Sequence, residues 1–196
     1  IRRDVNGAWD LATARARLAG LVGLGLEYVE QPIPAGDIAA LSSLGADSGV
    51  PIAADESVVS ATAARELVEA GAVAVLVVKP DRVGGPLAAL SIAREAAAAG
   101  VGVTISTLLD TGVGLAAAQR VAARLPGGAH GLATGDVLTN DLLATPLTVH
   151  GGRMDVPPAG PLALDEAAVD RFAIETVARG ERQGRRDRGD PTGARR

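Results

Sequence analysis

Polar residues recur at nearly constant intervals along this chain, each directly after a short run of β-branched or aliphatic residues. Asp4, Glu30, Asp55, Lys79 and Ser106 are separated by 26, 25, 24 and 27 residues. The runs before them are typical of buried parallel strands, and the Ala/Leu-rich segments between them have helical periodicity. The sequence therefore predicts an α/β fold with a parallel sheet, and helices near residues 10–20, 35–45, 60–70, 85–99 and 112–124.

The strand-like runs favour a barrel over an open sheet. In a (β/α)8 barrel the carboxyl ends of the strands meet at one face, where the loops build the active site. A doubly wound sheet usually has a glycine-rich GxGxxG turn after its first strand, and no run here is followed by that motif. We therefore expect a partial TIM-type (β/α)8 barrel built from the runs "IRRDV", "LEYVEQP", "VPIAADES", "VAVLVVKP", "VGVTIST" and "AHGLAT".

Three parts of the chain differ in pattern. Residues 1–145 carry the alternation and are expected to form the partial barrel, and residues 146–178 to form a return segment that ends in a helix. The tail, residues 179–196, is rich in Arg and Gly, which is typical of disorder. The alternative for the tail is an arm that binds anions or nucleotides, with salt-dependent affinity.

Charge and composition limit the classes of partner. The net charge is −4, and without the last 17 residues, which hold six Arg and three acidic residues, it is −7. An acidic body argues against nucleic-acid binding. The longest apolar run, residues 70–78, is far shorter than the roughly 20 residues that a membrane helix needs. With no cysteine there is no disulfide or thiolate site. We expect a cytoplasmic protein that acts on a small molecule, without nucleic-acid or membrane partners; the sequence does not predict the oligomeric state.

Three successive strand-like runs end in carboxylates. Neighbouring strands lie about 5 Å apart, so Asp4, Glu30 and Asp55 are expected to crowd together and to require a cation. Carboxylate ligation suits Mg²⁺, or Mn²⁺ as a substitute. Any one acid taken alone is better explained by a helix cap or an Arg partner, and it is the recurrence of three at one period that favours a cation site. Asn6, two residues after Asp4, either supports the ligand shell or is a turn residue in "NG".

Lys79 is the only lysine beside eighteen arginines. An amine can act as a base when its charged form is disfavoured, whereas a guanidinium in practice cannot. Placed one strand beyond the carboxylates and behind an apolar run, Lys79 is a candidate general base or electrostatic partner for an oxyanion. A cation beside an amine suits proton abstraction from the carbon next to a carboxylate.

The motifs "RRDVNGAW", "EYVEQP", "PIAADES", "VVKPDRVGG" and "TISTLLDTGVGLAAA", in this order and spacing, resemble the barrel of the enolase superfamily over roughly residues 1–160. By that resemblance Asp4, Glu30 and Asp55 match the metal ligands of the third, fourth and fifth strands. Lys79 matches the catalytic lysine of the sixth. Glu56, beside Asp55, and Asn6 are assigned to support of the metal site.

The subgroup follows from the same comparison. "VGVTIST" lacks the histidine of mandelate-racemase-like members, which leaves the lysine-type, muconate-lactonizing-enzyme-like subgroup. "DVNGAWD", "VVKPDRVGG" and "AHGLATGDVLTNDL" look most like the o-succinylbenzoate synthases. This resemblance implies a Mg²⁺-dependent lyase that dehydrates 2-succinyl-6-hydroxy-2,4-cyclohexadiene-1-carboxylate through a metal-stabilised enolate, in menaquinone biosynthesis. Ser106 and Gly131 match positions that contact substrate.

Other functions remain open at this point. N-succinylamino acid racemases and dipeptide epimerases of the same superfamily share the lysine that Lys79 matches, so Lys79 does not separate them from the synthases. The family also has a capping domain, two earlier strands and a Lys-x-Lys motif that match nothing in these 196 residues. We therefore expect a fragment, strands three to eight of the barrel, that is unstable or inactive alone. A non-catalytic, truncated metal-binding protein is the remaining alternative.

Overall fold

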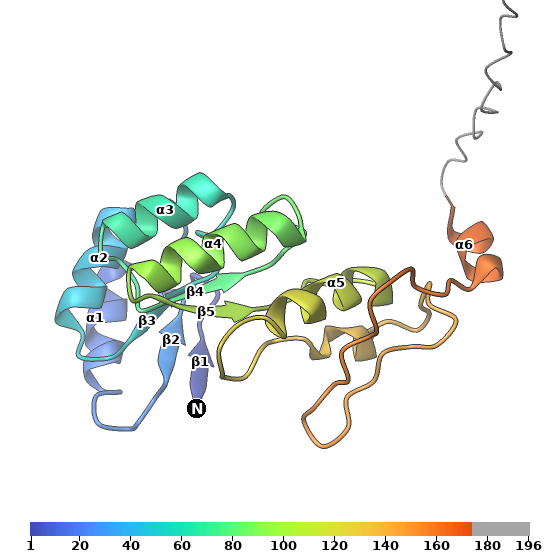
Figure 1. Cartoon of the computed structure of the whole chain (residues 1–196). Helices are drawn as coiled ribbons and strands as arrows, with labels where there is room; N and C mark the ends of the chain where they lie inside the picture. The colour runs from blue at the N-terminus through green and yellow to red at the C-terminus, as the bar shows by residue number, and fades with distance from the viewer. Residues whose placement is uncertain (174–196) are drawn as a thin grey trace, which may run out of the picture.

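Five parallel strands form one sheet in the order in which they occur along the chain (Figure 1). The computed structural model describes residues 1–173. Each strand is followed by a helix, which confirms the alternation that the even spacing predicted. The strands are β1 (Arg2–Asp4), β2 (Tyr28–Glu30), β3 (Ile52–Ala54), β4 (Val75–Val78) and β5 (Gly102–Ile105).

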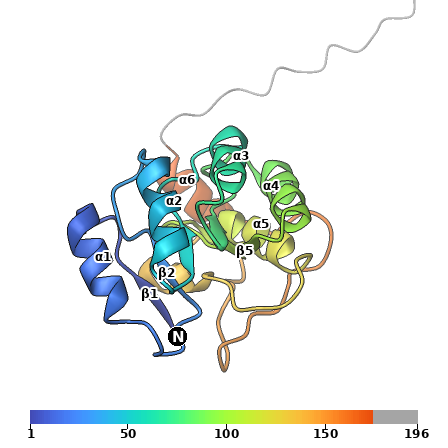
Figure 2. The ribbon, with the colours of Figure 1, turned by 90° about the vertical axis from the view of Figure 1, so that its left-hand side faces the viewer.

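The helices lie beside one another along one side of the sheet (Figures 1 and 2). The side chains of Asp10, Asp37 and Ser60 each accept a hydrogen bond from an N–H of the first turn of the helix that follows, which fixes where α1, α2 and α3 begin. Gly85 and Pro86 begin α4 without a side-chain cap. The helices are α1 (Leu11–Ala19), α2 (Ile38–Asp47), α3 (Ala61–Glu69), α4 (Pro86–Ala98) and α5 (Gly112–Ala122).

The two faces of the sheet bury different residues. Side chains alternate along a strand, so Val29, Ile52 and Leu76 point to the helices and join the large apolar core there. Tyr28, Ala53 and Val77 form a second, small apolar cluster on the other face. The residues two positions after these three, at the carboxyl ends, are Glu30, Asp55 and Lys79, so the strand period places all three on the face away from the helices.

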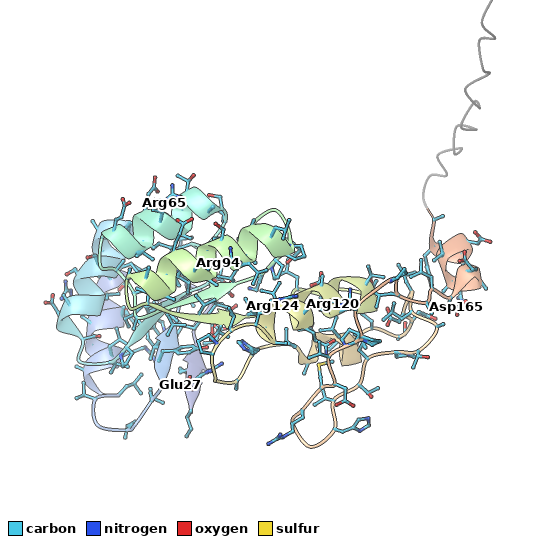
Figure 3. The ribbon with its side chains drawn as sticks, in the orientation of Figure 1. Glu27, Arg65, Arg94, Arg120, Arg124 and Asp165 are labelled. Atoms are coloured by element: carbon cyan, nitrogen blue, oxygen red, sulfur yellow. The ribbon has the colours of Figure 1, made fainter. Side chains whose placement is uncertain are left out.

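Two ion pairs lie away from the carboxyl ends of the strands. Arg65 on α3 and Glu95 on α4 form an exposed ion pair of 3.0 Å that links neighbouring helices. Figure 3 shows Arg65 and Arg94 on the helical layer, and Glu27 beside the start of β2. Arg2 donates to both carboxylate oxygens of Glu27, at 3.0 and 2.7 Å. The first pair lies on the outer surface of the helices and the second at the amino end of the sheet, so neither is near the carboxyl ends of the strands.

The prediction of a sixth strand at "AHGLAT" is wrong. This segment pairs with the sheet at a single parallel bridge, Gly131 to Ser106, and is not a continuous strand. Positive φ angles at Gly127 and Gly128 turn the chain just before the bridge. Immediately after it the 3-10 helix η1 (Ala133–Val137) begins, which leaves too few extended residues for a ladder.

The part of the chain after η1 contains little regular structure. Leu143 bridges Leu164 in antiparallel fashion, and α6 (Glu166–Phe172) follows in the region where the return segment was expected to end in a helix. The boundary between 145 and 146 stays a prediction. The expected disordered tail, residues 179–196, lies outside the described residues. Within residues 1–173, no helix combines the length and hydropathy required to cross a bilayer.

Gly45 offers a test of how closely α2 packs on the connection between α3 and β4. Gly45 lies inside α2, where alanine normally favours the helix by about 0.5–1 kcal/mol. A Cβ there would lie 2.7 Å from the main-chain oxygen of Ala72, which cannot rotate away. We expect Gly45→Ala to lower the free energy of unfolding by about 1–3 kcal/mol, as overpacked sites do, measured by urea unfolding.

Gly20 is the matched control. Its φ is −74°, and its Cβ would meet only the Arg17 oxygen at 3.5 Å, an ordinary contact. Gly20→Ala is therefore expected to be neutral or stabilising. Equal effects of the two substitutions would contradict the close approach of α2 to Ala72.

Candidate active site

Three acidic residues lie at the carboxyl ends of β1, β2 and β3. Asp4 and Glu30 are the last residues of their strands and are register partners across the β1–β2 ladder. Glu30 is in turn paired with Ala53, and Asp55 follows two residues later on the same face. The ladder therefore brings Asp4, Glu30 and Asp55 to one edge of the sheet, as their spacing in the sequence predicted.

Burial and the charges of this cluster act together on Glu30. Burial, and after it the negative charges of Asp4 and Asp55, raise the pKa of Glu30 from 4.5 to about 8, while Lys79 opposes the change. A carboxyl group with this pKa holds its proton at neutral pH unless a cation replaces the proton. The donor set is all oxygen and carries excess negative charge, which fits a hard divalent cation such as Mg²⁺ or Mn²⁺.

Lys79 lies directly against the cluster. It follows β4, and its Nζ donates to Oδ1 and Oδ2 of Asp55 at 2.6 and 2.5 Å. The two side chains are only 11% and 7% exposed, so the ion pair is largely shielded from water. The sequence predicted an amine near a cation; here the amine faces a carboxylate of the expected cation site. Lys79 is thus held at the one edge where all three carboxylates lie.

Glu56 and Asn6 have different relations to the cluster. Oε2 of Glu56 is buried and has no hydrogen-bond partner among residues 1–173, so within this part of the chain the oxygen can accept from, or ligate, a further group. Asn6 is exposed, with a φ of +51°, and its main-chain N–H donates to Oδ1 of Asp4 at 2.9 Å. Asn6 thus contacts Asp4 through its backbone and not through its side chain. This agrees with the prediction that Asn6 is a turn residue in "NG".

Ser106 and Gly131 lie together at the next position around the edge. Val78 is in register with Ile105, so Ser106 is level with Lys79. Oγ of Ser106 donates to the Gly131 oxygen at 3.3 Å. A Cβ on Gly131 would lie 2.9 Å from that Oγ, so a larger residue here would require the Ser106 hydroxyl to rotate away. The structure therefore brings these two predicted substrate-contact positions together, beside the lysine.

Gln31 is a residue that the sequence analysis did not single out. Its side chain is fully buried, and its Oε1 accepts from the main-chain N–H groups of Asp55 and Ser57 at 3.1 and 3.2 Å. It is the middle residue of "EQP", and a Gln between a strand-end acid and a proline was the available signal. Gln31 links the loop after β2 to the loop that carries Asp55.

The three carboxylates lie at the same edge of the sheet but are not yet arranged as a set of metal ligands. Within residues 1–173, no group of three His, Asp or Glu side chains is already arranged to hold a metal ion. Asp4 is exposed, whereas Asp55 is buried and paired with Lys79. A cation bound here would draw Asp4 inward and compete with the ammonium for Asp55.

Comparison with known proteins agrees with this arrangement. Residues 1–170 match the family model described as "Enolase C-terminal domain-like". The chain is 43% identical over 181 residues to an o-succinylbenzoate synthase of Thermobifida fusca, covering 91% of this chain and 54% of that protein. It is 40% identical over 126 residues to a chloromuconate cycloisomerase of Pseudomonas putida, covering 64% of this chain and 34% of that protein.

Solved structures give the same result. The muconate lactonizing enzyme of Klebsiella pneumoniae aligns with a TM-score of 0.83 and 33% identity, over 89% of this chain and 50% of that one. The chain belongs to the enolase C-terminal domain-like family, within the muconate-lactonizing-enzyme-like part of the enolase superfamily. It spans about half the length or less of the curated relatives named above. The parallel sheet and its helices correspond to a portion of the barrel of those enzymes.

The raised pKa of Glu30 predicts how stability depends on pH in the absence of metal. The ordinary value is 4.5 and the folded value is about 8, so the folded state binds the proton more tightly. Between these values the unfolded carboxyl is charged while the folded one remains protonated, so the free energy of unfolding falls as the pH rises. We expect the chain in EDTA to be less stable at pH 8 than at pH 6.5, measured by urea unfolding.

Glu30→Gln is the control for this slope. Burial lowers the pKa of His130 from 6.5, so the unfolded imidazole still binds protons around pH 6.5 and adds a change of opposite direction at the lower end of the window in both proteins. The variant has no carboxyl proton at this position and is expected to lack the fall in stability towards pH 8. Parallel profiles of the variant and the unsubstituted chain would contradict the charge crowding at Glu30.

Proposed function

We propose that this chain carries the metal-binding edge and one catalytic lysine of a Mg²⁺-dependent enzyme that dehydrates 2-succinyl-6-hydroxy-2,4-cyclohexadiene-1-carboxylate to o-succinylbenzoate. One observation carries the proposal: Nζ of Lys79 lies 2.6 Å from Asp55, at the strand ends that also hold Asp4 and Glu30. The 43% identity to a synthase of this name supports the choice of substrate. We assign the reaction to menaquinone biosynthesis in the cytoplasm.

Asp4, Glu30 and Asp55 are the proposed ligands, with Glu56 and Asn6 in support. When bound, Mg²⁺ supplies a positive charge that favours the developing negative charge of a carboxylate substrate. Glu30 must lose its proton to act as a ligand, since burial and its neighbours hold the pKa at about 8. Mn²⁺ is expected to substitute, because it prefers the same oxygen donors.

Lys79 is the proposed catalytic residue. Its Nζ is held by Asp55 at the cluster edge, so a substrate carboxylate bound beside Asp55 lies within reach of the amine. In the role that the resemblance implies for the synthases, the ammonium stabilises the oxyanion by its charge, and a second lysine moves the proton. Ser106 and Gly131, level with Lys79, are the proposed substrate contacts on its other side.

Binding of the reaction product tests the proposal on the chain itself. We expect the 196-residue chain to bind o-succinylbenzoate in the presence of Mg²⁺, measured by isothermal titration, and not in EDTA. Lys79→Ala should weaken this binding roughly 10- to 100-fold, because a charge-assisted hydrogen bond contributes about 1.5–3 kcal/mol. Arg94→Ala, which removes an exposed cation from α4, should leave the affinity unchanged.

Turnover is a separate measurement. Because Lys79 is the only lysine in this sequence, we expect no dehydration of the cyclohexadiene substrate by these residues alone. Mg²⁺ binding without any Mg²⁺-dependent product binding would contradict the proposed substrate and favour a non-catalytic metal-binding protein. Rapid turnover by the chain alone would contradict the two-lysine scheme.

A cycloisomerase is the second candidate. The similarity to a chloromuconate cycloisomerase and to muconate lactonizing enzymes supports it. Muconolactone in the same titration distinguishes the two: tighter Mg²⁺-dependent binding of muconolactone than of o-succinylbenzoate would favour cycloisomerisation. The racemase and epimerase alternatives stay predictions, and Mg²⁺-dependent binding of an N-succinylamino acid or a dipeptide would favour them.

A further inference from the structure

Beyond the end of β2, a side chain continues the hydrogen-bond ladder between β2 and β3. The N–H of Gln31 donates to the Ala53 oxygen at 2.8 Å, as in a regular parallel ladder. The next N–H in this series belongs to Asp55, and its regular acceptor would be the main-chain oxygen of Gln31. That oxygen instead accepts from Gly7 N at 2.7 Å. Asp55 N donates to the side-chain Oε1 of Gln31, at 3.1 Å.

The backbone of Gln31 explains the exchange. Its φ of +35° is in the left-handed region, which residues other than glycine rarely adopt, and Pro32 follows. This conformation turns the main-chain carbonyl toward the loop after β1. The position that the carbonyl leaves beside β3 is then filled by an oxygen that the side chain of the same residue supplies.

Both ends of the Gln31 amide are fully used. Oε1 accepts from the N–H groups of Asp55 and Ser57, and Nε2 donates to the Ile33 oxygen at 2.8 Å and to Oγ of Ser57 at 3.1 Å. Two N–H donors on one side and two oxygen acceptors on the other fix which end is oxygen. The residue has no exposed surface, so water cannot replace these partners.

We propose that Gln31 is the positioning residue of the cation site, setting the relative placement of all three carboxylate-bearing strand ends. This inference rests on the proposed metal site and extends it. The main-chain oxygen of Gln31 binds the turn after Asp4, Gln31 directly follows Glu30, and its side chain holds the N–H of Asp55. A single residue thus contacts the loops of all three proposed ligands, without touching the cation.

The rival account is that Gln31 only stabilises the fold. The two accounts differ in what happens to metal affinity at a temperature where each variant is folded. A residue that acts on ligand geometry changes the affinity, typically 10- to 100-fold for such outer partners of a metal site. A residue that only stabilises the fold changes the melting temperature and leaves the affinity of the folded protein unaltered.

The experiment is titration of the full chain with Mn²⁺, following free Mn²⁺ by electron paramagnetic resonance. Gln31→Met keeps the length of the side chain and removes its amide, and is expected to weaken Mn²⁺ binding at least tenfold. Ser57→Ala removes one acceptor for Nε2 and leaves the bond from Asp55 to Oε1, so its affinity should stay within about twofold. Leu67→Ala, a buried apolar substitution in α3, controls for lost stability and should also leave the affinity within about twofold.

A second variant covers the case in which Gln31→Met does not fold. Gln31→Glu keeps an oxygen for the Asp55 and Ser57 N–H groups, and is expected to bind Mn²⁺ at least as tightly as the unsubstituted chain. Weaker Mn²⁺ binding by Gln31→Glu would overturn the inference.

Three further outcomes bear on the two proposals. Unchanged Mn²⁺ binding by Gln31→Met, or equal losses of affinity in Gln31→Met and Leu67→Ala, would overturn this inference alone. Absence of Mn²⁺ binding by the unsubstituted chain would overturn the proposed metal site and this inference together.

Discussion

The repulsion between carboxylates at neighbouring strand ends is the constraint on which the rest of this site depends. A parallel ladder spaces strands about 4.8 Å apart, so the backbones of the register partners Asp4 and Glu30 cannot separate without breaking the sheet, and only rotation of the side chains can part their carboxylates. Asp55 adds a third negative group from the next strand. The protein relieves this crowding in two ways: Glu30 takes up a proton, and Lys79 donates to both oxygens of Asp55. The proton on Glu30 and the ammonium of Lys79 each place one positive charge among the carboxylates, where a divalent cation would place two.

The fold serves this constraint by keeping two functions on separate faces. The helical face contains the larger apolar core, so the strands are held by residues such as Val29 and Leu76 that take no part in the site. On the other face Tyr28, Ala53 and Val77, with Val75 packed against them, form a smaller apolar cluster. Polar residues can therefore gather above that cluster while the helix-facing core supplies most of the buried apolar contact.

Much of this could be predicted from sequence because it follows from periodicity. The intervals between Asp4, Glu30, Asp55 and Lys79 predicted their adjacency, and the structure places each at a strand end. The sixth strand was predicted from composition, but extended pairing there is limited to Gly131, since glycine turns and a 3-10 helix enclose it. The role of Gln31 was not predicted, because it depends on a positive φ angle that no pattern of apolar residues encodes. The membership in the enolase superfamily came from motifs, and comparison confirmed it.

The central claim is that the three carboxylates form one cation site whose protons and metal compete. Isothermal titration with Mg²⁺ at pH 7, repeated in buffers of different ionisation enthalpy, measures both the binding and the protons released. The account predicts saturable binding of one ion with release of about one proton, because Glu30, with a pKa of about 8, must ionise to ligate. It also predicts that Glu30→Gln abolishes the proton release. No saturable binding, or the same proton release from Glu30→Gln, would contradict it.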